Sequence, residues 1–133
     1  MWVGNLRPGF AQVDAEEEAS RVLPMIEEIR RRFDVPISVD TYKASVAEQA
    51  IQAGADLVND VWGLKKDPAM AGVIAKHGVA CCLMHNKKEA VYDNFLVDML
   101  HETQECVNLA RLRGFRQTES LWTPAWALER IMR

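Results

Sequence analysis

The sequence predicts an α/β fold in which parallel strands alternate with helices within one domain of 133 residues. Three short apolar runs, at residues 35–39, 55–58 and 79–84, are the predicted strands, and stretches with helical periodicity separate them. Apolar residues at nearly every position of a run are typical of parallel strands that are covered on both faces. The glycine-rich turn of a dinucleotide-binding fold is absent from the sequence. Its absence favours a barrel over an open sheet without deciding between them.

The first predicted helix begins after Asp14, which forms a capping box with Glu17. Acidic residues at the start of this stretch and arginines at its end suit the helix dipole. Pro24 lies inside the stretch and can kink it, because proline lacks the backbone N–H. The apolar residues that recur at helical spacing are Val22, Ile26, Ile29 and Phe33.

The second and third predicted helices have clear ends. The second stops at Gly54, and the third begins at Asp67, an N-cap followed by Pro68, and stops at Gly78. The apolar face of the second helix consists of Val46, Ala47, Ala50 and Ile51.

The last predicted helix runs roughly over residues 93–113 and is closed by Gly114. Strands and helices that follow one another at such short intervals predict right-handed crossovers and strands adjacent in chain order. The residues expected to turn toward the core are Phe95, Met99, Leu100 and Val107.

Composition excludes several function classes. With 16 basic and 19 acidic residues the net charge is -3, which argues against a nucleic-acid-binding protein held by phosphate contacts and against a polybasic membrane-surface protein. No apolar run approaches the roughly 18–20 residues of a membrane span, and no secretory signal is visible. Cys81, Cys82 and Cys106 lack the spacing of a zinc site and are expected to be reduced core thiols, which fits a cytoplasmic protein.

Each predicted strand ends in polar groups. The end of the first strand gives Ser38, Asp40 and Thr41, that of the second gives Asn59 and Asp60, and that of the third gives His85 and Asn86 together with the apolar Met84. In α/β proteins the functional site gathers at the carboxyl ends of parallel strands. The sequence therefore predicts a site at this end of the sheet.

Structural roles are open alternatives for the same residues. Asp40 or Thr41 could cap the following helix, and Asn59 and Asp60 could be turn residues. His85 by itself is more readily explained as a structural histidine than as a catalyst.

Four segments, in this order and at these intervals, resemble dihydropteroate synthase, an enzyme of folate biosynthesis. They are Arg7-Pro8-Gly9, residues 36–43 (Pro-Ile-Ser-Val-Asp-Thr-Tyr-Lys), Gly54-Ala55-Asp56 with Asn59-Asp60-Val61, and Leu83-Met84-His85-Asn86. The resemblance covers about residues 7–114. It implies a (β/α)8 TIM barrel, of which this chain holds about strands two to five.

The resemblance also implies the reaction and the site. The family is a transferase that joins 6-hydroxymethyl-7,8-dihydropterin pyrophosphate to p-aminobenzoate, releases pyrophosphate and is assisted by Mg²⁺. Asp40 and Asn59 would bind the pterin ring, whose edge offers adjacent donors and acceptors. Val61 and Met84 would line the pterin slot, and Arg7 would belong to a substrate loop. No residue is implied as a catalytic acid or base or as a metal ligand.

Both ends of the chain depart from the family's pattern. The Gly-Glu-Ser-Thr that precedes Arg-Pro-Gly in the family, and the Asp-Pro-Gly-x-Gly-Phe-Gly-Lys that follows its fifth helix, are absent. Codons shifted by one base permit Val-Gly-Gly-Glu-Ser from residues 1–6 and Asp-Pro-Gly-Val-Gly-Phe-Gly-Lys from residues 122–130. We therefore expect residues 1–6 and 115–133 to be out of frame and the tail to pack irregularly. Resequencing the DNA tests this hypothesis.

The family's first strand, and the lysine, arginine and histidine of its later strands, have no counterpart in the chain. We therefore expect no turnover from this chain alone, and self-association or a homodimer through unpaired sheet edges. Two alternatives stay open: a methyltetrahydrofolate-binding methyltransferase barrel, and a half-barrel remnant without enzymatic activity.

Overall fold

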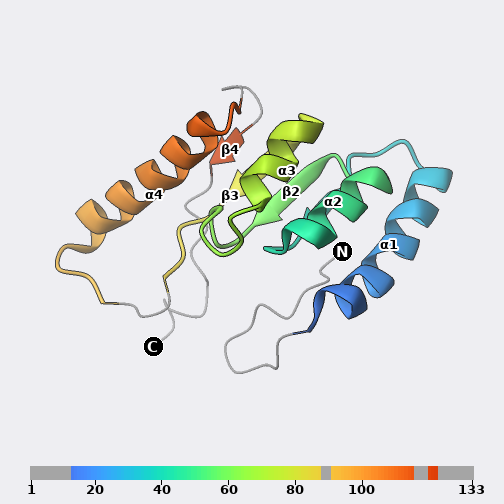
Figure 1. Ribbon diagram of the computed structural model, residues 1–133, viewed down its shortest axis with the longest axis horizontal. Coiled ribbons are helices and arrows are strands. Elements are labelled where there is room, and N and C mark those ends of the chain that lie inside the picture. The colour runs from blue at the N-terminus through green and yellow to red at the C-terminus, as the bar shows by residue number, and fades with distance from the viewer. Residues whose placement is uncertain (1–12, 88–90, 116–119, 123–133) are drawn as a thin grey trace.

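The computed structural model describes residues 13–87, 91–115 and 120–122, the last three by their backbone alone. Helices and strands alternate along the chain, as the sequence predicts (Figure 1). The elements are α1 (Ala15–Arg32), β1 (Ser38–Asp40), α2 (Ala44–Gln52), β2 (Leu57–Asp60), α3 (Met70–His77), β3 (Ala80–Leu83), α4 (Phe95–Leu112) and β4 (Ser120–Trp122).

The strands form one parallel sheet in the order β1-β2-β3-β4. The prediction that the first three strands are parallel and adjacent in chain order is confirmed. β4 differs from the irregular packing expected after residue 115, because its backbone pairs with residues 81–83 of β3. A parallel ladder uses N–H and C=O groups that nearly every residue carries, so it demands little of the side chains. The rest of the tail lies outside the described residues.

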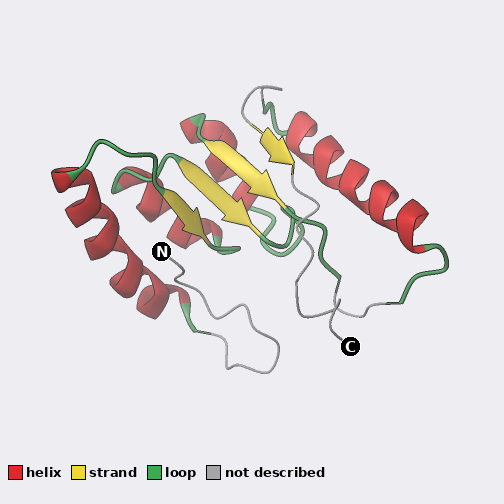
Figure 2. Cartoon of the chain, turned by 180° about the vertical axis from the view of Figure 1, so that it is seen from behind, coloured by secondary structure: helices red, strands yellow, loops and turns green. Residues whose placement is uncertain are grey.

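The described helices lie on one face of the sheet. Figure 2 looks onto the other face, with α2 and α3 behind the strands, and no described helix covers that face. α1 packs against α2, and α2 against α3. A parallel sheet with its described helices on one face agrees with part of a (β/α)8 barrel, whereas an open doubly wound sheet has helices on both faces. The predicted fold class is therefore confirmed.

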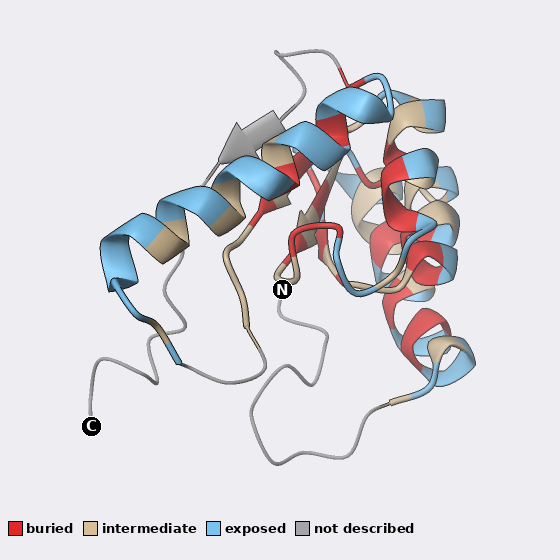
Figure 3. Ribbon diagram, turned by 60° about the vertical axis from the view of Figure 1, so that its left-hand side comes forward, coloured by how far each residue is buried: buried red, intermediate tan, exposed pale blue. Residues whose placement is uncertain are grey.

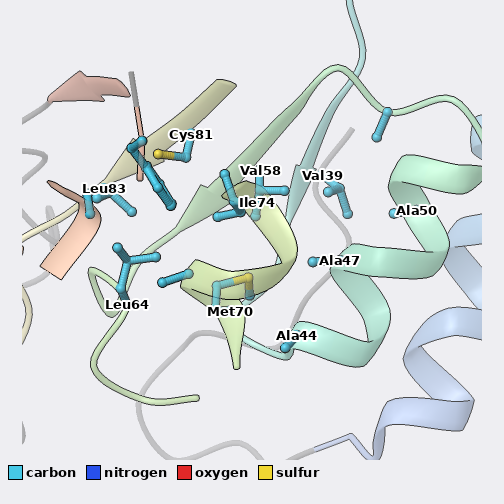
Figure 4. Packing of buried hydrophobic residues seen from close by; sticks show 14 of the residues in the cluster. Val39, Ala44, Ala47, Ala50, Val58, Leu64, Met70, Ile74, Cys81 and Leu83 are labelled. Carbon is cyan, nitrogen blue, oxygen red and sulfur yellow. The ribbon is translucent and has the colours of Figure 1, made fainter. Parts of the chain in front are cut away.

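The core fills the space between the sheet and the helices. Successive strand residues point to opposite faces, so every second side chain of β1, β2 and β3 is buried against the helices. The buried sides of the helices face the same space (Figure 3). The strand residues of this core are Val39, Val58, Cys81 and Leu83, and its helix residues include Ala47, Met70 and Ile74 (Figure 4).

β1 begins at Ser38, three residues later than the apolar run suggests. Pro36 has no N–H to donate to a neighbouring strand. The N–H of Ile37 donates instead to the carboxylate of Asp56 at 2.8 Å, and Val35 is exposed. This part of the run is therefore held by the Asp56 side chain together with backbone hydrogen bonds to the Ile37 carbonyl, from the N–H groups of Asp56 at 2.9 Å and Leu57 at 3.2 Å.

α1 has the predicted start. The Asp14 carboxylate accepts a hydrogen bond from the Glu17 N–H at 2.7 Å. The helix continues through the exposed Pro24 to Arg32. Phe33, expected on the apolar face, is the C-cap and is 57% exposed, because its extended backbone ends the helix and carries the ring away from the core. The predicted apolar residues that are buried are Val22 and Ile26.

Asp67 lies at the N-termini of two helices. The sequence predicts it as the N-cap of the third helix, but α3 begins at Met70 and its N-cap is Ala69. One Asp67 oxygen accepts from the Ala69 N–H at 3.0 Å, and the other accepts from the N–H of Ala44, the first residue of α2, at 2.8 Å. The second bond joins residues far apart in the sequence, so no local pattern predicts it. α3 ends at Gly78, as predicted.

α4 turns a different face to the core from the one that its apolar spacing suggests. Phe95 and Leu100 were expected inside but are exposed, whereas Met99 and Val107 are half-buried. Apolar residues occur on more than one side of this helix, so periodicity alone cannot select the buried side. The buried residues of α4 are Cys106 and Ala110. Neither α4 nor any other helix in the described ranges is long and apolar enough to cross a membrane.

Candidate functional site

The carboxyl ends of β1 and β2 bring Asp40 and Asn59 together. The two residues are partners in the register of the parallel pair. Val39 and Val58, one position earlier in each strand, are buried against the helices. Alternation therefore places Asp40 and Asn59 on the face of the sheet that no described helix covers. The sequence predicted that both residues lie at strand ends, and the register makes them neighbours.

Asp40 is a half-buried carboxylate that is incompletely satisfied. Its Oδ1 atom is buried and has no hydrogen-bond partner among the described residues. Burial raises the pKa of Asp40 to about 6, hydrogen bonding to Asn59 opposes the rise, and the charges of Asp60 and Glu18 add to it. A buried polar atom without a partner costs free energy, so a ligand that donates to Oδ1 gains from satisfying it.

The two apolar candidates lie beside this pair. Val61 directly follows β2, Met84 directly follows β3, and both are half-buried. The Met84 N–H donates to the Asp60 carbonyl at 3.3 Å, which extends the parallel ladder by one bond. Asp60 pairs with Leu83, so Val61 and Met84 are the next neighbours in the register. Arg7, the fifth predicted site residue, lies outside the described residues.

Asp60 and Thr41 hold the loops of this end of the sheet. The Asp60 carboxylate is 1% exposed and accepts from the N–H groups of Trp62 at 2.9 Å and Leu64 at 2.8 Å. Burial raises the pKa of Asp60, and the two backbone hydrogen bonds partly oppose the rise. The Thr41 hydroxyl accepts from the N–H of Lys43, the N-cap of α2, at 3.1 Å. The structural alternative therefore applies to Asp60 and Thr41.

His85 belongs to a cluster around a glutamate of α4. Its Nε2 lies 2.9 Å from Oε2 of Glu102, whose other oxygen accepts from Lys87 Nζ at 2.7 Å. Lys65 Nζ, from the loop after β2, lies 3.8 Å from the same carboxylate. The side chain of His85 is 11% exposed, which favours the structural interpretation of this histidine. The sequence offered no signal for Glu102, which lies 17 positions from its histidine partner.

A pocket of about 490 Å³ lies on the other side of this cluster, between α4 and the segment that precedes it. It contains neither Asp40 nor Asn59. Its lining residues are Lys87, Val91, Asp93, Val97, Asp98, His101 and Glu102. Asp40 and Asn59 therefore lie outside this pocket.

Within residues 13–87 and 91–115, no three histidine, cysteine or acidic side chains lie close enough to hold a metal ion. The charge of Asp60 acts on Asp40, but the oxygens of Asp60 are engaged by backbone N–H groups. The described side chains therefore offer no group of three such ligands to the Mg²⁺ ion that the family resemblance implies.

Known proteins resemble the chain in sequence and in structure. Residues 3–127 match the family model of pterin binding enzymes. The dihydropteroate synthase of Clostridium beijerinckii is 52% identical over 118 residues, which are 89% of this chain and 44% of that protein.

Two crystal structures give the same result. Dihydropteroate synthase from Clostridium difficile, solved in the presence of pteroic acid, superposes with a TM-score of 0.88 at 39% identity over 91% of this chain and 46% of that chain. The synthase of Xanthomonas albilineans with 4-aminobenzoic acid also gives 0.88, at 33% identity over 93% of this chain and 45% of that chain. This chain thus spans less than half the length of these relatives. Its parallel half-barrel, its strand-end polar residues and the family match over residues 3–127 show that the chain belongs to the family of pterin binding enzymes.

Proposed function

We propose that this chain carries the pterin-binding part of a dihydropteroate synthase. The observation that carries the proposal is the pair of Asp40 and Asn59 on neighbouring strands, with Oδ1 of Asp40 buried and lacking a partner. A pterin presents N–H donors and ring acceptors side by side on one edge, and a carboxylate beside an amide can satisfy both kinds. The relatives named above are synthases, which supports this function over the methyltransferase alternative.

Val61 and Met84 complete the proposed slot. Both are half-buried and follow the strand ends next to Asn59. Apolar side chains contact the faces of a flat ring, while the polar pair fixes its edge and its orientation. A methionine adapts its shape to such a surface because its side chain is unbranched and polarisable.

The proposed reaction requires positioning more than acid–base catalysis. The p-aminobenzoate nitrogen attacks the methylene carbon of the pterin pyrophosphate, a C–N bond forms, and the C–O bond to pyrophosphate breaks. The bonding electrons leave with pyrophosphate, and the amine loses a proton. Fixing the pterin at Asp40 and Asn59 holds the methylene in place for this attack.

Titration of the chain with 6-hydroxymethylpterin, followed by calorimetry, tests the binding step. We expect Asp40→Ala to weaken binding by about 10–100-fold, the effect of losing a hydrogen bond to a charged group. Asn59→Ala should weaken it by a smaller factor. Asp34→Ala is the matched control, because this exposed carboxylate precedes β1 and lies away from the strand ends. Equal affinities for Asp40→Ala and Asp34→Ala would contradict the proposed site.

A coupled assay for pyrophosphate release separates binding from catalysis. Steady release from pterin pyrophosphate and p-aminobenzoate, abolished by Asp40→Ala, would mean that the chain performs the whole reaction. Binding without release would restrict its role to the pterin site.

The proposal includes a cytoplasmic location and small-molecule substrates. It also includes self-association or a homodimer, since β1 and β4 are the outer strands of the described sheet and edge strands can pair with another chain. Sedimentation velocity of the purified chain at two concentrations tests this part.

A further inference from the structure

We propose that Glu102 is a positioning residue that holds Met84 in place through His85 and Lys87. The role of Met84 in a pterin slot rests on the proposed function. The connection from Glu102 to the Met84 segment rests on the contacts of the described residues alone. The two can therefore be tested separately.

Glu102 connects its own helix, α4, to two other parts of the chain. Its two oxygens contact His85 Nε2 at 2.9 Å and Lys87 Nζ at 2.7 Å, and both partners belong to the segment that follows β3. Lys65 Nζ, at 3.8 Å, belongs to the loop between β2 and α3. The side chain of Glu102 is 16% exposed and that of His85 is 11% exposed, so their contact is the most shielded of the three.

The Met84 segment needs such an anchor. The Met84 N–H makes a ladder bond to the Asp60 carbonyl, just beyond the end of β3. After that bond the backbone leaves the sheet, and the side chains of His85 and Lys87 tie it to α4. His85 is the immediate neighbour of Met84, so a shift of the imidazole moves the backbone that carries the methionine.

The charge of Glu102 matters as well as its shape. Burial alone would raise the pKa of Glu102, but the hydrogen bond from Lys87 and the charges of His85, Lys65 and Lys87 outweigh burial and lower it. The carboxylate is therefore ionised at neutral pH. A glutamine keeps the shape but removes the charge that holds the lysines in place.

Glu102→Gln is the main variant, and Glu105→Gln is its matched control. Glu105 lies on the same helix and is half-exposed. Its one ion pair among the described residues is with His101, whose Nδ1 lies 3.7 Å from Glu105 Oε1. The readout is the Met84 methyl resonance of the full chain labelled with ¹³C-methyl methionine, assigned by its loss in Met84→Leu. We expect this resonance to shift or broaden in Glu102→Gln and to stay unchanged in Glu105→Gln.

Lys87→Gln provides a second test that does not depend on the solubility of the first variant. This lysine is 36% exposed, and its replacement removes one of the two close contacts of Glu102. It should move the Met84 resonance in the same way but less. An unchanged Met84 resonance in both variants would overturn the proposal.

Binding of 6-hydroxymethylpterin distinguishes the two proposals. If the wild-type chain binds it, we expect about tenfold weaker binding in Glu102→Gln, since small displacements of a positioning group carry large penalties. Wild-type affinity in that variant would overturn the positioning role. Failure of the wild-type chain to bind pterin would contradict the proposed function, while the methyl spectra would still decide whether Glu102 holds Met84.

Discussion

Replacing Asp40 by asparagine should stabilise the folded chain at pH 8. Asp40 is partly buried, its Oδ1 lacks a partner among the described residues, and the negative charges of Asp60 and Glu18 lie near it. Ionising this carboxylate therefore costs free energy in the folded state. An asparagine of the same shape has no charge to bury.

The magnitude follows from the pKa of Asp40, which rises from 3.8 to about 6 on folding. Between these pH values the folded chain holds more protons than the unfolded chain, so stability falls as the pH rises through this window. The full shift corresponds to about 3 kcal/mol. Because the side chain keeps some contact with water, screening reduces the expected effect to about 1–2 kcal/mol, complete above pH 6.

Urea unfolding of the wild-type chain and Asp40→Asn at pH 4 and pH 8 measures this effect. The difference in unfolding free energy between the two proteins cancels the titration of groups that do not interact with Asp40. We expect Asp40→Asn to gain about 1–2 kcal/mol relative to wild type on going from pH 4 to pH 8. Asp34→Asn, the exposed control, should show no such change. A difference between wild type and Asp40→Asn that stays constant with pH would refute the argument.

Two further predictions concern the loop after β2. Asp60→Ala removes the acceptor of two N–H groups, so the unfolding free energy in urea should fall by about 2–4 kcal/mol, and a loss below 0.5 kcal/mol would contradict the loop-holding role of Asp60. Gly63→Ala should lower the unfolding free energy by at least about 1 kcal/mol. Gly63 has a φ of +59°, which disfavours alanine, and an added Cβ would lie 2.6 Å from Cys106 Sγ and 2.8 Å from the Met84 carbonyl oxygen. In a double-mutant cycle Cys106→Ala should recover part of this loss, and strict additivity of the two changes would rule out the steric contact.

The helix ends and strand positions were largely predictable because their signals are local. The Asp14 cap and the Gly78 stop depend on residues within one turn of the helix end. The apolar runs identified β1, β2 and β3, with two shifts. β1 begins at Ser38 because the Ile37 N–H donates to Asp56, and β2 spans Leu57–Asp60, two residues later than the predicted 55–58.

The buried face of α4 was not predictable for a different reason. Phe95 and Leu100 are as apolar as any core residue, yet both are exposed, whereas Cys106 and Ala110 are buried. A helix with apolar residues on several sides can pack in more than one orientation, and its contacts with the rest of the protein select one.

The sequence by itself determined the chemistry of the strand-end site: an aspartate, an asparagine and a methionine at the ends of three consecutive strands. Only the tertiary structure decided which of these groups meet. The register of β1 and β2 pairs Asp40 with Asn59. Side chains alternate along β2, so the Asp60 side chain points to the opposite face, where it accepts a hydrogen bond from the Leu64 N–H of the following loop. Likewise, Glu102 reaches His85 only because α4 packs beside the end of β3. The reason is that side-chain direction depends on register and packing, which join segments whose separation in the sequence carries no information about their contact.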